Sequence, residues 1–132
     1  MRIQDNDSIS NVTNPVDIEA ALGKRDGAGR NSFWLSHGAE LYPVINIMVK
    51  GDVAYLGYFP NEDHPGFNSV GESLNLSRGG YTTFFPDDTN ETLQIMNEAV
   101  VPFSDALRAA QEFAVSKTFP KCIRWTSLVE GE

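Results

Sequence analysis

The stretch YPVINIMVKGDVAYLGYF, residues 42–59, decides the fold that we predict for this chain. Its first half, 42–50, alternates loosely and is rich in the β-branched side chains that favour strands. Gly51-Asp52 is typical of a tight turn, and a second strand-like run follows over 53–59. We therefore predict two antiparallel strands joined at Gly51-Asp52.

Shorter strand-like runs flank this hairpin in the sequence. They contain aromatic or β-branched residues and are bounded by Gly, Pro, Asn and Asp. These runs cover residues 32–36, 64–70 (interrupted by Pro65-Gly66), 81–85, 91–96 and 123–128. Successive runs of this kind predict a twisted, mostly antiparallel sheet of about five or six strands.

Two segments have helical spacing instead. Residues 102–117 place apolar side chains at the i, i+3, i+4 and i+7 positions of a helix that packs on a sheet, and Leu107, Ala110 and Phe113 should face that sheet. Residues 14–22 begin with Asn14-Pro15, which suits a helix cap and a first helical position. The helices and strands predict an α+β fold. The helix in the C-terminal half should cover one face, with the short N-terminal helix nearby and Trp125 on an adjoining strand.

The length of 132 residues suits a single domain, which we expect to span 1–132. Residues 1–13 are polar, and we expect them to be flexible. They lack the apolar run of a signal peptide, and no stretch approaches the roughly 18 apolar residues of a membrane span. The single cysteine, Cys122, cannot form an internal disulfide. These features predict a cytoplasmic protein without a membrane partner.

The net charge of −8 is unevenly distributed along the chain. Residues 52–105 contain nine acidic residues and one basic residue, so this segment carries as much net charge as the whole chain. The acids are Asp52, Glu62, Asp63, Glu72, Asp87, Asp88, Glu91, Glu98 and Asp105, and the base is Arg78. Because phosphate binding needs clustered Lys and Arg, this pattern disfavours direct nucleic-acid binding and favours a basic protein partner.

No arrangement of residues predicts catalysis. Neither of the two histidines, His37 and His64, has a nucleophile or second metal ligand at a suitable spacing, and Cys122 reads as a packed or unreactive thiol. The Gly-rich loop 24–30 follows a helix and precedes a strand, the reverse of a phosphate-binding loop. We therefore predict no enzymatic activity, no metal and no cofactor.

An aromatic stretch interspersed with acids, residues 55–67, is the best candidate for a binding surface. Aromatic side chains within a polar rim are common anchors of interfaces, and the Pro and Gly residues predict a loop. Tyr55, Phe59 and Phe67 could instead belong to the core. The predicted partner-binding residues are Asp52, Tyr58, Glu62, Asp63, His64, Phe67 and Glu72, together with Asp87 and Asp88.

Several segments resemble the first immunity-protein family of bacterial polymorphic toxin systems. They are GDVAYLGYFP (51–60), HPGF (64–67), NEAVVP (97–102) leading into DALRAA (105–110), and IRW (123–125). Each segment is short, but their shared order and spacing extend the similarity over roughly residues 40–128.

The resemblance implies a cytoplasmic antidote that binds one cognate toxin domain, one to one, and blocks its active site. Toxins encoded beside this family include nucleic-acid deaminases and nucleases. An enzyme that grips nucleic acid needs a basic cleft, which an acidic inhibitor can fill. Two alternatives remain open on the sequence: a small ligand-binding or enzymatic α+β domain, which a buried polar pocket would indicate, and an interaction module unrelated to toxins.

Overall fold

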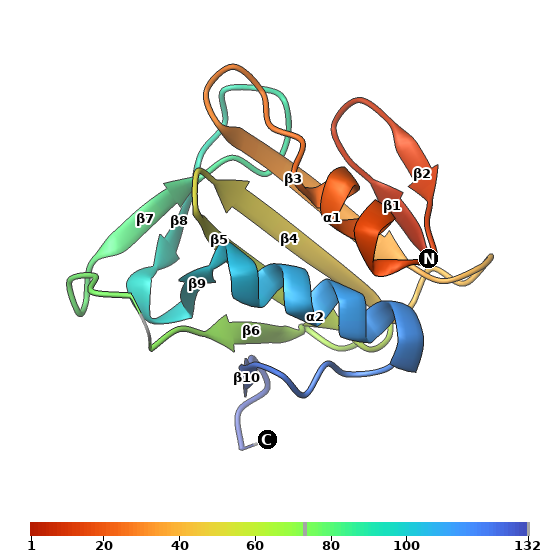
Figure 1. The fold of residues 1–132 in the computed structure, drawn as a ribbon. Coiled ribbons are helices and arrows are strands. Elements are labelled where there is room, and N and C mark those ends of the chain that lie inside the picture. The colour runs from red at the N-terminus through yellow and green to blue at the C-terminus, as the bar shows by residue number, and fades with distance from the viewer. Residues whose placement is uncertain (73, 132) are drawn as a thin grey trace.

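In the computed structural model, which describes residues 1–72 and 74–131, two helices lie on one face of an antiparallel sheet (Figure 1). Within these residues the sheet has eight strands, in the order β10-β6-β5-β4-β3-β1-β2, with β9 also paired to β5. They are β1 (Arg2–Gln4), β2 (Ile9–Asn11), β3 (Arg30–Ser36), β4 (Val44–Lys50), β5 (Val53–Phe59), β6 (Phe67–Val70), β9 (Val100–Pro102) and β10 (Arg124–Ser127).

The remaining elements are a second, two-stranded sheet of β7 (Tyr81–Phe84) and β8 (Leu93–Met96), the helices α1 (Pro15–Leu22) and α2 (Phe103–Ser116), and the 3-10 turn η1 (Asn97–Ala99). The predicted α+β class with a mostly antiparallel sheet is confirmed. The main sheet has more strands than predicted.

The predicted hairpin forms the middle of the sheet. β4 and β5 pair from Val44–Phe59 to Lys50–Val53, and Gly51 in the turn has a φ of 58°, a conformation that favours glycine. Every residue of β4 except Lys50 is buried. Since successive side chains of a strand point to opposite faces, this hairpin requires cover on both sides.

The two helices cover the first face (Figure 1). The side chain of Asn14 caps α1 by accepting a hydrogen bond from the backbone N–H of Asp17 at 2.8 Å. As predicted, Ala110 and Phe113 of α2 are buried against the sheet, and Leu107 is half-buried at the edge of the same core. Among the described residues, no helix combines the length and the apolar character needed to span a membrane.

The β7–β8 hairpin covers part of the second face. Phe84 of β7 is fully buried against Met48 of β4 and Val100 of β9, and Ile95 of β8 packs beside them. This cover does not reach Trp34 on β3, which is 45% exposed. The second face is therefore only half covered.

An aromatic cluster holds the C-terminal segment on the helix face. Phe119 lies edge to face against Tyr58 and Phe67, with ring centroids 4.7 and 4.9 Å away. Trp125 lies 5.1 Å from Phe119 and donates its indole N–H to the Pro120 carbonyl oxygen at 2.8 Å. These contacts position β10 as the edge strand beside β6, which confirms the placement of Trp125 on a strand adjoining the core.

The N-terminal segment corrects our expectation for residues 1–13, which form strands β1 and β2. Ile3 and Val12 are buried, and the amino group of Met1 donates to the Val12 carbonyl oxygen at 2.8 Å. Each strand has only three residues, too few for apolar alternation to stand out in a polar segment. These two strands also contribute to the larger size of the sheet.

Replacing Phe113 with Ala should lower the free energy of unfolding by about 3–5 kcal/mol, because the side chain is fully buried and its removal leaves a cavity. The matched control is Val115→Ala on the same helix, where the side chain is 81% exposed and the change should stay within about 0.5 kcal/mol. Both are measured by denaturant titration. A loss below about 1 kcal/mol for Phe113→Ala would contradict this account of the core.

Candidate partner-binding surface

Most of the predicted binding residues lie at two ends of the sheet. Asp52 is in the β4–β5 turn and Glu62 is in the β5–β6 loop, so the seven-residue strand β5 separates them. A strand of that length spans about 20 Å. We call one end of the strands the Gly51 end; it is formed by the β1–β2, β4–β5 and β7–β8 turns and loop 23–29. We call the opposite end the Phe59 end; it is formed by loops 37–43 and 60–66.

Tyr58, one of the predicted partner-binding residues, lies in the core. It is 5% exposed, and its ring packs edge to face on Phe113 at 6.4 Å and on Phe119 at 4.7 Å. Burial raises the pKa of its phenol. Alternation along β5 was evident in the sequence, but the face that the helix covers was not. A partner therefore cannot reach this ring without opening the core.

The β5–β6 loop presents Glu62 and Asp63 to solvent. The side-chain oxygen of Asn61 accepts hydrogen bonds from the backbone N–H groups of Asp63 and His64 at 3.0 and 3.1 Å, which shapes the turn. The ring of His64 stacks on Phe67 at 4.8 Å, with the ring planes 12° apart. His64 and Phe67 are half-buried. The two acids are thus available for contacts, while the two rings support the loop beneath them.

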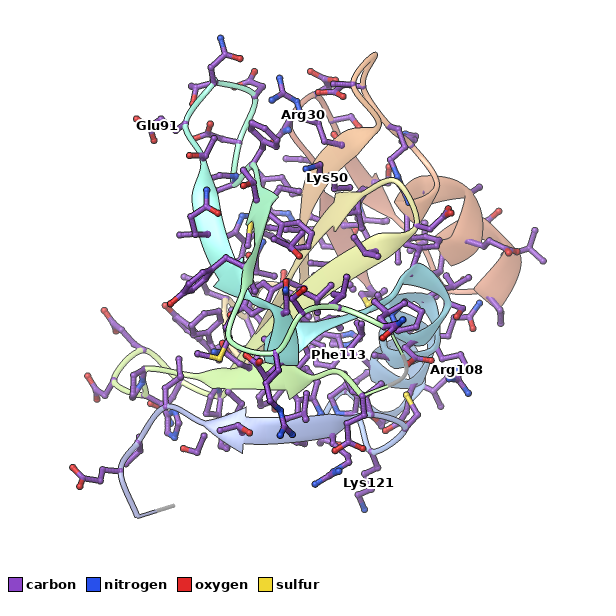
Figure 2. The ribbon with its side chains drawn as sticks, turned by 90° about the vertical axis from the view of Figure 1, so that its left-hand side faces the viewer. Arg30, Lys50, Glu91, Arg108, Phe113 and Lys121 are labelled. Atoms are coloured by element: carbon purple, nitrogen blue, oxygen red, sulfur yellow. The ribbon has the colours of Figure 1, made fainter. Side chains whose placement is uncertain are left out.

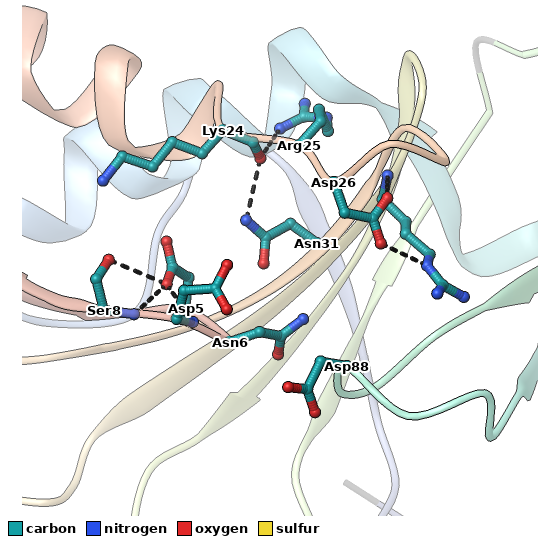
Figure 3. A pocket seen from close by; sticks show the side chains of 10 residues that line it. Asp5, Asn6, Ser8, Lys24, Arg25, Asp26, Asn31 and Asp88 are labelled. Carbon is teal, nitrogen blue, oxygen red and sulfur yellow. Dashed lines mark hydrogen bonds and ion pairs between the residues drawn. The ribbon is translucent and has the colours of Figure 1, made fainter.

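A mixed-charge pocket of about 390 Å³ lies at the Gly51 end, with walls that include Asp5, Lys24, Asp26 and Asp88 (Figure 3). Asp26 organises the Gly-rich loop. Its carboxylate accepts the backbone N–H groups of Ala28 and Arg30 at 2.8 and 3.1 Å, and it pairs with Arg30 Nε at 2.6 Å. That side-chain hydrogen bond lowers the pKa of Asp26. The loop therefore satisfies its own donors, consistent with a connector rather than a phosphate cradle.

The other acids of the Gly51 end lie among basic side chains. Asp87 accepts hydrogen bonds from the backbone N–H and the hydroxyl of Thr89. These bonds lower the pKa of Asp87, and the bond from the hydroxyl has the largest effect. Glu91 lies at the same edge of the molecule as Arg30 and Lys50 (Figure 2). The guanidinium of Arg30 lies 4.2 Å from the Phe85 ring centroid, which places the base at the foot of the β7–β8 loop. Asp52, Asp87 and Asp88 therefore belong to a surface of mixed charge.

Glu72 is engaged within the chain, although its side chain is 63% exposed. It forms an ion pair with Arg124 of β10. Asp105 similarly pairs with Arg108 one turn further along α2. Such exposed pairs contribute little to stability. Their effect here is to neutralise two of the nine acids in the segment 52–105.

No catalytic centre is evident in the part of the chain that the structure describes. Cys122 is exposed, and partial burial of its thiol together with the nearby Glu112 carboxylate raises its pKa, which disfavours the reactive thiolate. Residues 1–72 and 74–131 contain no group of three or more His, Cys, Asp or Glu side chains placed to hold a metal.

An exposed aromatic residue that sequence reasoning missed lies at the Phe59 end. Trp34 borders a pocket of about 300 Å³ that Leu41, Tyr42 and Val44 also line. Alternation along β3 puts Trp34 on the face of Ser32 and Ser36, opposite Phe33 and Leu35. The two serines made this face the more polar one in the sequence, although both are buried in the structure.

His37 lies at the same end but on the helix side, where it contacts the core residue Phe113. Its Nε2 lies 2.9 Å from the Phe113 carbonyl oxygen, and its ring centroid lies 4.8 Å from that of Phe113. Burial is the main cause that lowers its pKa below the usual 6.5, and the Met1 amino group and Lys117 lower it further. The hydrogen bond to Phe113 opposes this shift only in part.

Comparison with known proteins gives one informative relative. No protein-family model matches this chain. Over 107 residues the chain is 26% identical to a protein of Burkholderia cenocepacia (strain H111) named double-stranded DNA deaminase immunity protein. The match covers 81% of this chain and 83% of the relative. The resemblance to immunity proteins of toxin systems, inferred from the sequence motifs, is confirmed by this relative, and among the toxin classes considered it points to deaminases.

The lowered pKa of His37 predicts a pH-dependent stability. The unfolded chain binds the proton more tightly than the folded chain, so stability is lost as the pH falls below about 6.5. A His37→Gln variant keeps a side-chain donor for the Phe113 carbonyl but does not titrate. Its unfolding free energy should fall less than that of the original chain between about pH 8 and pH 5. Denaturant titrations at each pH give these free energies. If they fall by the same amount in both proteins over this pH range, the assignment to His37 is contradicted.

Proposed function

We propose that this chain is an immunity protein that binds a toxin domain with double-stranded DNA deaminase activity and neutralises it by covering the active site. The similarity over 81% of the chain to a protein of that name carries the proposal. The matched motifs of the sequence lie on the framework of the fold: the β4–β5 hairpin, the start of α2 and β10.

The charge of the chain supports this function. A deaminase that acts on DNA must hold the phosphate backbone, which requires a basic surface. A chain with a net charge of −8 is attracted to such a surface and repelled by DNA itself. We propose one-to-one binding in the cytoplasm without any contact to DNA. The chain acts by occlusion, and it needs neither a metal nor a cofactor nor catalysis of its own.

Among the predicted contact residues, the exposed loop acids Glu62 and Asp63 suit this role best, with His64 and Phe67 holding the loop. The Gly51 end carries a second acidic group, Asp52, Asp87 and Asp88, with basic side chains among them. The alternative of a small-ligand or enzymatic domain has no support from the mixed-charge pocket. The Asp26 carboxylate in its wall already bonds to the loop backbone and Arg30.

The decisive measurement is inhibition of a toxin domain by the purified chain. We expect it to inhibit the deaminase domain encoded in the neighbouring gene stoichiometrically, with a dissociation constant on the order of 1 nM or tighter, as for other inhibitor interfaces of standard size. Deamination of double-stranded DNA is followed against increasing inhibitor, and the chain alone should show no deamination. An active toxin domain that stays uninhibited at excess chain would overturn the proposal, as would a neighbouring gene without a toxin domain.

A further inference from the structure

The uncovered half of the second sheet face carries an apolar surface at the Phe59 end. Trp34 is 45% exposed there and Leu41, in loop 37–43, is 62% exposed. The ring of Phe59 lies 6.3 Å from that of Trp34 and is half-buried. Trp34 and Leu41 line the pocket of about 300 Å³, and Phe59 lies beside Trp34. Large apolar side chains gathered at a pocket are typical of the centre of a protein interface.

Hydrogen bonds hold the sheet beneath this surface in one arrangement. Asn46, paired with Trp34 across the strands, donates its side-chain amide to Ser32 Oγ at 3.3 Å and to the Phe33 carbonyl oxygen at 3.0 Å. The Tyr55 hydroxyl donates to the Asn68 side-chain oxygen. A surface that is already ordered loses little conformational entropy when a partner binds.

Gly57 contributes to the shape of the same surface. A Cβ atom at this position would lie 3.2 Å from the Tyr55 hydroxyl and 3.3 Å from the Phe59 ring. Both rings therefore lean over the glycine from neighbouring positions of β5. Burial raises the pKa of Tyr55 to about 12, so its hydroxyl remains a neutral donor to Asn68.

Three exposed acidic side chains lie in the two loops at the same end of the sheet as the apolar surface. Glu40 is exposed in loop 37–43, and Glu62 and Asp63 are exposed in loop 60–66. The pairing of Val44 with Phe59 makes both loops leave the sheet at the same end (Figure 1). None of the three acids forms an ion pair within residues 1–72 and 74–131. They remain available to basic groups of a partner.

The basic groups near this end are few. Lys117 and the Met1 amino group act on His37, which lies on the helix side of the sheet. Arg2 lines the pocket and donates to the Gln4 side-chain oxygen at 3.2 Å. At the Gly51 end, by contrast, Lys24, Arg25, Arg30 and Lys50 lie among the acids.

We infer that the Trp34 surface, formed by Trp34, Leu41 and Phe59 with Glu40, Glu62 and Asp63 at its edge, is where the toxin domain docks. The inference rests on the proposed function. An apolar side chain of the toxin enters the pocket beside Trp34 and Leu41, and lysines and arginines around it pair with the three acids. The apolar centre governs how slowly the complex dissociates, and the acids govern how fast it forms.

The test compares matched variants for binding to a catalytically inactive form of the deaminase domain encoded beside this chain. Trp34→Ala and Leu41→Lys should each weaken binding by at least about 30-fold, mainly through faster dissociation. The control Tyr81→Ala, in which an aromatic side chain 66% exposed on β7 is removed, should change binding by less than about threefold. Unfolding curves identify any variant that fails to fold. Leu41 lies in an exposed loop, so its variant keeps the test valid if Trp34→Ala is unstable.

A second comparison tests the acids. Glu62→Gln with Asp63→Asn should slow association and weaken its dependence on salt, whereas Glu19→Gln with Glu91→Gln, which removes the same two charges from exposed positions away from this surface, should have a much smaller effect. If the original chain does not bind the toxin domain at all, the proposed function fails. If it binds and the Trp34 and Leu41 variants bind equally well, only the docking inference is overturned. A dimer that Leu41→Lys dissociates, with toxin binding unchanged, would overturn it too, because a second copy would be the occupant.

Discussion

Burial of the β4–β5 hairpin on both faces is the constraint on which the rest of the structure depends. Six of the seven residues of β4 are buried, and they alternate between the two sides of the sheet. Burying each large apolar side chain contributes about 1.5–3 kcal/mol, so neither side can be left open along the whole strand. The helices cover one side completely. The β7–β8 hairpin covers the other side over Met48 but not over Asn46, where the amide is satisfied by hydrogen bonds instead.

This arrangement separates stability from recognition. The framework consists of strands whose apolar residues must be retained, and the acids lie mainly in the turns between them. Residues in such loops can vary without loss of the core. Trp34 combines features of the framework and of the exposed loops. Its backbone belongs to β3, but its side chain is exposed on the half of the second face that the β7–β8 hairpin does not cover.

Electrostatics and packing then have distinct roles at the two ends of the sheet. At the Gly51 end, acids organise loops through bonds to their own backbone, as Asp26 and Asp87 do. At the Phe59 end, Glu62 and Asp63 are displayed by a turn that Asn61 closes. Acidic side chains thus organise loops at the Gly51 end and form an exposed surface at the Phe59 end.

The sequence by itself determined the hairpin, both helices and most strand positions, because turn residues, caps and apolar periodicity act over a few neighbouring residues. It also determined the acidic character of the chain. The tertiary structure alone decided that Tyr58 is buried and that Trp34 is exposed. Alternation divides a strand into two faces, but which face is covered depends on elements far away in the chain. The two strands within residues 1–13 could not be predicted from the local sequence either, because a three-residue strand is specified by the strands it pairs with in the sheet.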